Sequence, residues 1–416
     1  MARILLAILT VLISTIAYRA RYTIPTLLIR DPSLPSEYYH RGPASSHCTH
    51  VRAPNTAFSS CEDARFWDIL DANGERAQRH VLLSCDAHRK GWNTVLGPLK
   101  DPAPRGSLWV YPVHRSNSSF APAPRQVTLE SYPAEHSFHP LGVAVTPARP
   151  GIPSTLLVVN HARTRSSLEQ FVLSWDNDTD PDAPTNPPPR ATWIRTLRSP
   201  YFVAPNSIAL TSSAPLSFYL SNDHLFTRRI PYPLGSLLAL AETYLGIPTS
   251  WVGHVTLARC RRRRTLAISS TSRAQILFYT RDPATHALSF HSRVHVPFAP
   301  DNLHFDNKGQ LLVAGHPHAP AVATVAASVG GARAPSWVVM LKPRTDTEVA
   351  DSEGFDLRAP VSASSKVPSP PNWAMETLYQ TNGEGFMTAT TALQSEDTDT
   401  LYVSGLYEDG LLACSL

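Results

Sequence analysis

The stretch Ala299–His316, APDNLHFDNKGQLLVAGH, predicts the local structure around which the chain is organised. A short strand is expected from Asn302, followed by a turn at Asp306–Gly309 and an apolar strand, because Asn and Gly tolerate the positive φ of tight turns. The adjacent pair Asp301-Asn302 places two hard oxygen ligands at the strand start, and Ca²⁺ prefers such ligands. Asp and Asn also cap ordinary turns. The calcium interpretation therefore depends on partners elsewhere in the chain.

Composition favours an all-β fold. The 416 residues include 38 Pro and 19 Gly, with 9% aromatic and 17% charged residues, which is typical of a turn-rich β protein. All-β barrels and propellers reach this length as one domain. The net charge of +4 is modest, and the basic run Arg261–Arg264 has no interleaved aromatic residues. Nucleic acid is therefore not expected as a partner.

Short apolar and β-branched runs recur in pairs along the chain and predict repeated antiparallel sheets. The pairs within Leu156–Phe171 and Leu266–Phe278 share one pattern, in which a strand, a turn and a second strand with an aromatic residue follow one another. Such repetition is typical of propellers, and about 370 residues divide into six four-stranded blades of roughly 60 residues. The sequence therefore predicts a six-bladed β-propeller over residues 48–416. A helix is expected at Leu234–Leu245, before the helix-stopping Gly246.

The N-terminus predicts a targeting segment. Residues 4–17 are apolar after a basic start, and no clear cleavage site precedes Arg19. We interpret residues 1–21 as a hydrophobic helix that is a signal peptide or a retained signal anchor, which would allow membrane association. Residues 22–47 are expected to form an extended lead-in. The protein is therefore expected in the secretory pathway, extracellular or membrane-anchored on the lumenal side.

Two further features bear on that location. The sequons at Asn117 and Asn177 are candidate glycosylation sites and agree with a secretory protein. The five cysteines have no metal-type spacing, and their odd number leaves at least one thiol unpaired.

Two segments offer partners for Asp301-Asn302. Glu62-Asp63 precedes a segment inclined to be buried. Adjacent side chains on a strand point to opposite sides, so these carboxylates would suit two calcium ions stacked along an axis, although an exposed acidic turn is the alternative. Asn206 follows Ala-Pro, as Asp301 does. The first strand of each blade lines a propeller channel, so Asn206 and Asn302 are expected to converge there.

A series of motifs runs through the chain in order. It comprises Cys48, Cys61-Glu62-Asp63, Phe138–Val143 (FHPLGV), Leu156–His161 (LLVVNH), Pro205–Ile208 (PNSI), Tyr219–His224 (YLSNDH), Asp301-Asn302, Gly315–Pro317 (GHP) and Cys414. In this order and spacing the series resembles the paraoxonase/arylesterase family, from about Cys48 to Leu416. The resemblance implies a six-bladed propeller with two calcium ions in its tunnel, a disulfide between Cys48 and Cys414, and hydrolysis of lactones and aryl esters.

The resemblance also implies roles for single residues. Glu62, Asn206, Asp301 and Asn302 resemble ligands of a catalytic calcium ion, which would polarise the substrate carbonyl. Asp63 and the backbone carbonyl of Val143 resemble ligands of a structural calcium ion. His161 resembles the second member of a histidine dyad that activates water.

Three departures from the family pattern qualify this interpretation. Leu141 stands where the family has the histidine that activates water, and general-base catalysis contributes about 10²- to 10⁴-fold. Ser207 stands where an Asp would bind the structural ion, which weakens that site. Residues 252–265 lack the stretch with a further calcium-binding Asn.

Two functions follow from these observations. The first is a calcium-dependent hydrolase of aryl esters or lactones, whose activity is weakened by the departures. In this enzyme His316, His224 or a metal-bound carboxylate transfers the proton. The second is a non-catalytic secretory propeller that keeps calcium as a structural pin and binds a partner through its loops. The four oxygen ligands favour the enzyme, because a metal-polarised carbonyl can be attacked without a dedicated histidine.

Overall fold

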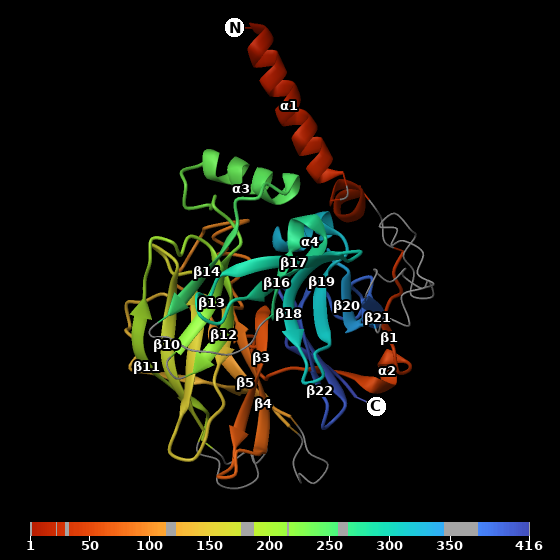
Figure 1. Ribbon diagram of the computed structural model, residues 1–416. Coiled ribbons are helices and arrows are strands. Elements are labelled where there is room, and N and C mark those ends of the chain that lie inside the picture. Colours follow the sequence, from red (N-terminus) through yellow and green to blue (C-terminus); the bar gives the residue numbers. More distant parts are fainter. Residues whose placement is uncertain are drawn as a thin grey trace.

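Six β-sheets are arranged around a central axis, with their strands running roughly along it (Figure 1). The computed structural model describes residues 2–21, 23–29, 33–113, 122–175, 187–213, 216–256, 265–344 and 373–415. The fold is a six-bladed β-propeller, which confirms the predicted fold class. Asn117, Asn177 and the basic run Arg261–Arg264 lie outside the described residues.

The first two blades are antiparallel except for one parallel edge strand, β7. From the axis outward, the first contains β3 (Cys61–Leu70), β4 (Arg76–Cys85), β5 (Ser107–Pro112) and β6 (Arg125–Gln126), and the second contains β8 (Pro140–Val145), β9 (Ser154–Asn160), β10 (Ser167–Ser174), β11 (Arg190–Leu197) and β7 (Thr128–Glu130).

The third and fourth blades have three strands each within the described residues. They contain β12 (Pro205–Ser213), β13 (Leu216–Asn222) and β14 (Trp251–Thr256), then β15 (Thr265–Ser270), β16 (Gln275–Arg281) and β17 (Leu288–His295). Within the part of the chain that the structure describes, each of these two sheets thus has one strand fewer than the four expected in every blade.

The last two blades each take their outermost strand from the N-terminal part of the chain. The fifth contains β18 (Ala299–Phe305), β19 (Leu311–His316), β20 (Ser336–Pro343), β21 (Trp373–Thr381) and β1 (Tyr38–Tyr39), and the sixth contains β22 (Ala389–Ser395), β23 (Thr400–Gly405), β24 (Leu411–Cys414) and β2 (Cys48–Val51). A disulfide joins Cys48 in β2 to Cys414 in β24. The ring is thus closed by hydrogen bonds and by one covalent bond.

The predicted hairpin and the predicted central helix are both confirmed. β18 and β19 pair as a hairpin whose turn contains Gly309 at φ 78°. The helix α3 spans Leu234–Leu245 and ends at Gly246, which adopts the left-handed conformation with φ 59°. The remaining helical segments are α1 (Ala2–Ala20), η1 (Ile24–Ile29), α2 (Ala44–His47), η2 (Thr271–Arg273) and α4 (Ala319–Ala326).

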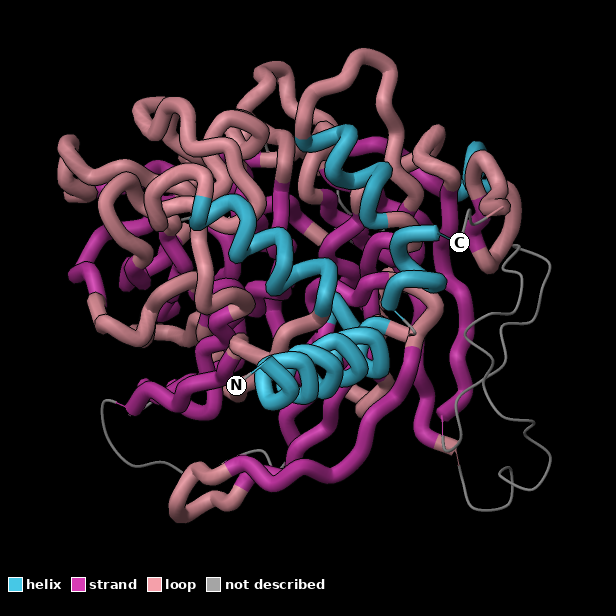
Figure 2. The backbone as a smooth tube through the Cα atoms, turned by 90° about the horizontal axis from the view of Figure 1, so that it is seen from above, coloured by secondary structure: helices cyan, strands magenta, loops and turns pink. Residues whose placement is uncertain are grey.

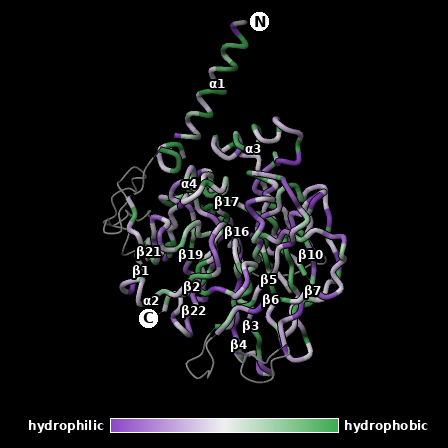
Figure 3. Tube along the Cα trace, turned by 180° about the vertical axis from the view of Figure 1, so that it is seen from behind, coloured by the Kyte–Doolittle hydropathy of each residue, from purple (hydrophilic) through white to green (hydrophobic). Residues whose placement is uncertain are grey.

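The helices α1, α3 and α4 gather at one end of the propeller, and α1 projects away from it (Figures 1 and 2). The described part of α1 exposes apolar side chains such as Ile4, Leu5 and Leu12, and Figure 3 shows its apolar colouring. None of the helices in the described residues combines the length and the apolar character needed to cross a membrane. Membrane association through this segment therefore stays a prediction.

The core lies between neighbouring blades. On β9, Leu156 and Val158 pack with side chains of the first blade, whereas Leu157 and Val159 pack with those of the third. Successive side chains on a strand point to opposite faces, so a strand buried on both faces needs an uninterrupted apolar run. The run ends at Asn160, which is 1% exposed and accepts the backbone N–H of His139 at 2.9 Å. Polar side chains thus begin where the strands reach the end of the tunnel.

Candidate active site

β-bulges interrupt five of the six innermost strands. The pairing register shifts at Cys61–Asp63, Pro140–Val143, Pro205–Ile208, Pro300–Leu303 and Ala389–Thr391. A bulge inserts an extra residue and redirects the neighbouring side chains. The inserted segments contain Glu62, Leu141, Asn206, Asp301, Asn302 and Thr390. The bulged segments therefore contain all four residues that are expected to bind the catalytic calcium ion.

The exception is β15, which pairs with β16 in continuous register from Thr265 to Ser270. This strand follows the part of the sequence from which the expected calcium-binding Asn is missing. Its contribution to the site is different, because the Ser269 hydroxyl donates a hydrogen bond to the backbone oxygen of Asp301. β15 thus supports the neighbouring strand β18.

A cavity of about 790 Å³ is lined by residues of four of the five bulged segments. The predicted residues that line it are Glu62, Leu141, His161, Asn206, His224, Asp301, Asn302 and His316. Apolar side chains, including Ile208, Leu266 and Leu277, form another part of its wall. The structure thus brings the predicted catalytic and catalytic-calcium residues to one cavity, whereas Asp63 and Val143 are fully buried.

Glu62 and Asn302 are in direct contact. The Asn302 amide nitrogen lies 3.2 Å from Glu62 Oε1 and 3.0 Å from Thr391 Oγ1. Glu62 is 3% exposed, and among the described residues its Oε2 has no hydrogen-bond partner. Burial, followed by the negative charges of Asp301 and Asp63, raises the pKa of Glu62 well above its usual value. The carboxylate therefore lacks the positive charge that a cation would supply.

Asp301 is paired with His316. His316 Nε2 lies 3.1 Å from Asp301 Oδ2. A carboxylate oxygen accepts, so Nε2 carries a proton, and in the neutral ring Nδ1 is an acceptor. His316 Nδ1 is buried and has no partner among the described residues. The pair thus presents an imidazole with one free basic nitrogen.

The donor set fits calcium. Glu62 and Asp301 offer carboxylate oxygens, and Asn206 and Asn302 offer amide oxygens, all hard ligands. Across the described residues, no three His, Cys, Asp or Glu side chains form a metal-binding group by themselves. The expected set has only two carboxylates, so two ligands must come from amides.

Gly142 sets the spacing between β8 and β12. A Cβ atom at this position would lie 2.0 Å from the backbone oxygen of Asn206. No other residue allows this approach without a backbone shift. Gly142 therefore lets the strand that carries Leu141 pack directly against the strand that carries Asn206.

His161 is held at both ring nitrogens. Nε2 lies 2.7 Å from the backbone oxygen of Pro205, which can only accept, and Nδ1 lies 2.6 Å from Thr94 Oγ1. Nε2 is therefore protonated, and Nδ1 accepts from the Thr94 hydroxyl. Burial lowers the pKa of His161 to about 4. In this arrangement His161 is a neutral ring that fixes the segment leading to Asn206.

His224 occupies another part of the cavity, beside α3. Its Nε2 lies 2.8 Å from Thr243 Oγ1, and its Nδ1 lies 3.4 Å from Asp223 Oδ1. Burial disfavours the charged ring, but the charge and hydrogen bonding of Asp223 outweigh burial and raise the pKa of His224. His224 is therefore better suited to carry a proton than His161.

Sequence reasoning gave no role to a buried pair in the same cavity, His139 and Asp86. His139 Nδ1 lies 2.9 Å from Asp86 Oδ2, and its Nε2 lies 3.1 Å from the backbone oxygen of Pro102. Each ring nitrogen therefore has an oxygen partner, and these two contacts fix the orientation of the ring. The motif FHPLGV contains His139, but the signal was incomplete because Asp86 is 53 residues away.

The sequence also gave no role to two arginines at the cavity. Arg89 is 4% exposed and donates from Nη2 to the backbone oxygen of Pro140 at 2.9 Å. Arg65 forms an ion pair with Asp63, with Nη1 3.2 Å from Oδ1. Their proximity to Glu62 and Asp63 depends on strand packing, which the sequence does not reveal.

Comparisons with known proteins add little to this geometry. No family profile matches the chain, and no curated protein matches it. Among solved structures the chain is similar to a candidate gluconolactonase, at 13% identity and TM-score 0.32, with 88% of this chain and 97% of that chain covered. It is also similar to a candidate 6-phosphogluconolactonase from Bacteroides fragilis, at 11% identity and TM-score 0.25, with 88% and 89% covered.

A protein of unknown function from Desulfotomaculum acetoxidans is similar at 9% identity and TM-score 0.33, with 81% of this chain and 86% of that chain covered. Identities and TM-scores this low carry no information about activity. Function is therefore argued from the cavity and its residues.

Proposed function

We propose that this chain is a calcium-dependent hydrolase of lactones or aryl esters with a reduced set of proton-transfer groups. The observation that carries the proposal is the buried Oε2 of Glu62, which has no partner among the described residues and lies in the same cavity as Asp301, Asn302 and Asn206. A buried carboxylate without compensation is costly. A cation held by these four residues would remove that cost. The resemblance to the paraoxonase/arylesterase family supports the same assignment.

The chain's own residues have separable roles in this proposal. Bound calcium would polarise the substrate carbonyl and stabilise its oxyanion. His316 Nδ1 is the free basic nitrogen that accepts a proton, and Asp301 orients that ring through Nε2–H at 3.1 Å. His161 positions the Asn206 segment through the Pro205 backbone oxygen. The apolar cavity wall around Leu266 and Leu277 suits the carbon skeleton of an ester.

A second candidate function is a calcium-binding propeller without catalysis. Two observations favour it. Leu141 supplies an apolar side chain to the cavity wall where a base was expected, and both ring nitrogens of His161 are already engaged. Such a protein would bind its partner through its loops, and the calcium ion would only stabilise the fold.

Hydrolysis of phenyl acetate and of a γ-lactone, each with calcium and with a chelator, tests the proposal. We expect slow turnover that chelation abolishes and that Asp301→Ala abolishes. Calcium should also raise the melting temperature of the wild type but not of Asp301→Ala. Stabilisation without turnover would select the binding propeller. If calcium does not change the melting temperature of the wild type, both candidate functions are refuted.

The location remains part of the proposal. The described residues contain the disulfides Cys48–Cys414 and Cys61–Cys85. Disulfides persist in oxidising compartments, so we infer an extracellular or lumenal protein. The signal or anchor role of residues 1–21 and glycosylation at Asn117 and Asn177 stay predictions.

A further inference from the structure

The two adjacent acidic residues of β3, Glu62 and Asp63, differ in how their charges are balanced. Glu62 Oε1 has the Asn302 amide as partner at 3.2 Å, and Oε2 has none among the described residues. Asp63 has 0% exposure, and both of its oxygens are engaged. Of these two residues, only Glu62 thus has a buried carboxylate oxygen without a hydrogen-bond partner among the described residues.

The contacts of Asp63 come from three strands. Oδ1 accepts the Ala64 backbone N–H at 2.9 Å and lies 3.4 Å from Thr391 Oγ1. Oδ2 accepts the Val143 backbone N–H at 2.9 Å. Val143 therefore approaches Asp63 with a backbone donor, which takes one of the acceptor positions of Oδ2.

Arg65 places a positive charge beside Asp63. The two residues are two positions apart on β3 and so share a face of the strand. Arg65 Nη1 lies 3.2 Å from Asp63 Oδ1, and the Arg65 side chain is 16% exposed. The ion pair is therefore largely shielded from water and is formed by neighbours on one rigid strand.

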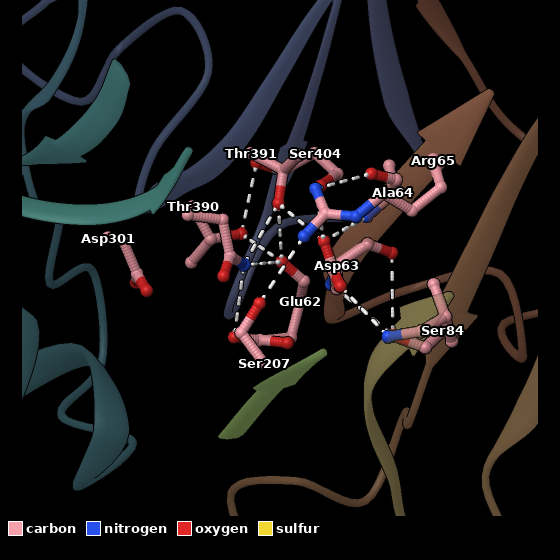
Figure 4. Close-up of polar contacts among 12 residues, drawn as sticks. Glu62, Asp63, Ala64, Arg65, Ser84, Ser207, Asp301, Thr390, Thr391 and Ser404 are labelled. Atoms are coloured by element: carbon pink, nitrogen blue, oxygen red, sulfur yellow. Dashed lines mark hydrogen bonds and ion pairs between the residues drawn. The ribbon is translucent and has the colours of Figure 1, made fainter. Parts of the chain in front are cut away.

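The same guanidinium reaches across the tunnel to another blade. Arg65 Nη2 donates to Ser207 Oγ on β12 at 3.3 Å. Figure 4 shows the guanidinium among Glu62, Asp63 and Ser207. An aspartate at position 207 would offer a carboxylate to a metal, whereas the serine hydroxyl offers an acceptor that suits an N–H group.

We infer that Arg65 is a built-in cation that takes the place of a second calcium ion between Asp63 and Ser207. A divalent ion there would lie against a guanidinium and against the Val143 N–H, so the residues present do not fit the expected structural calcium. The chain thus binds one calcium ion fewer than the resemblance implies. The inference rests on the proposed function only for the ion at Glu62.

Calcium stoichiometry tests this inference directly. Equilibrium dialysis, followed by elemental analysis, would compare the intact wild type with Arg65→Gln/Ser207→Asp. The double variant removes the guanidinium and adds a carboxylate, so we expect it to bind one more calcium ion per chain than the wild type. Arg65→Lys keeps the positive charge and should bind the same number of ions as the wild type.

The outcomes separate this inference from the proposed function. An equal stoichiometry in the wild type and the double variant overturns it, as does a wild type that holds two ions. A wild type without bound calcium refutes the proposed metal at Glu62, yet one ion gained by the double variant still supports the role of Arg65. If the double variant does not fold, Arg65→Gln alone replaces it. Calcium should then raise its melting temperature more than that of Arg65→Lys, and equal shifts overturn the inference.

Discussion

His80 is a buried histidine outside the tunnel. Its ring packs between Trp67 and Trp175, with centroid distances of 5.4 Å and 4.9 Å. In the described residues neither ring nitrogen has a hydrogen-bond partner. Burial lowers the pKa of His80 to about 3. The folded chain therefore keeps this ring neutral at pH values where the unfolded chain protonates it.

This difference predicts acid sensitivity. Because the folded pKa lies below the unfolded value of about 6.5, His80 contributes stability above pH 6.5 that is lost as the pH falls towards 3. The loss reaches roughly 3 kcal/mol at pH 4. We expect His80→Phe to flatten the pH dependence of the unfolding free energy by about that amount, measured by urea denaturation between pH 4 and 7.

His291→Phe is the matched control, because His291 is exposed on β17. The unfolding free energy of His291→Phe should depend on pH in the same way as that of the wild type. If His80→Phe and the wild type lose stability in parallel as the pH falls, the account of His80 is wrong.

Leu141→His restores an imidazole at the cavity wall. If calcium held by Glu62, Asn206, Asp301 and Asn302 polarises the substrate, the added base should raise esterase activity about tenfold or more. The measurement is the rate of phenyl acetate hydrolysis at saturating calcium, beside the wild type. A folded, calcium-binding variant with no gain would favour the binding propeller.

Residue patterns reveal some roles and hide others. The place of Asp301-Asn302 in the cavity wall could be predicted because two oxygen side chains follow Ala-Pro at a strand start, and their role as calcium ligands stays a prediction. Arg65 could not, because its role depends on Ser207, which lies 142 positions away. The engagement of His161 with Thr94 was hidden for the same reason. Contacts between blades decide these roles, and sequence spacing does not encode them.

At the scale of elements, strand packing determines where the site residues lie. Gly142 on β8 marks the closest approach to β12, because an added Cβ would lie 2.0 Å from the Asn206 backbone oxygen. Any side chain at this position must push apart the strands that carry Leu141 and Asn206. Stability and the proposed calcium site are therefore coupled at one glycine.

Gly142→Ala should destabilise the fold by roughly 1–3 kcal/mol, the usual cost of overpacking. It should also weaken calcium binding, because Asn206 must shift. Gly253→Ala on β14 is the control, since no atom lies within 4 Å of its added Cβ. Urea denaturation and calcium titration of both variants provide the test, and equal behaviour of the two would refute the coupling.

Elements with a strong local pattern could be predicted from the sequence. The helix Leu234–Leu245 has the expected bounds because an apolar run and the stopping Gly246 define it. The helix Ala319–Ala326 was not predicted, since its Pro and β-branched residues give a weak helical signal. The bulges were also not predicted, because a bulge is a relation between two paired strands.

At the scale of the whole molecule, closure of the ring depends on the two ends of the chain. β2 pairs with β24, and the Cys48–Cys414 disulfide spans 366 positions. The Cys61–Cys85 disulfide spans only 24 positions within the first blade. The longer loop restricts the unfolded chain more, so the ring-closing bond should contribute more stability.

Removing each disulfide by paired Cys→Ser substitution tests this order. By the chain-entropy relation, loss of Cys48–Cys414 should cost roughly 5–6 kcal/mol and loss of Cys61–Cys85 roughly 3 kcal/mol. Urea denaturation with a chelator present keeps calcium out of the comparison. A larger loss for the Cys61–Cys85 pair would contradict the ring-closure account.

The pairing of N-terminal strands with C-terminal strands also determines when these strands find their partners during synthesis. Tyr38 and Tyr39 pair with β21, and β2 pairs with β24. At about 5–20 residues per second, a ribosome needs roughly 20–70 s to add the 366 residues between the two ring-closing cysteines. Within that interval β1 cannot pair until β21 (Trp373–Thr381) has been added, and β2 cannot pair until β24 (Leu411–Cys414) has been added. A nascent chain that stops before Trp373 leaves both strands without these partners, and one that stops before Leu411 still leaves β2 unpaired with β24. Unpaired strands of this kind are surfaces that chaperones must shield from aggregation.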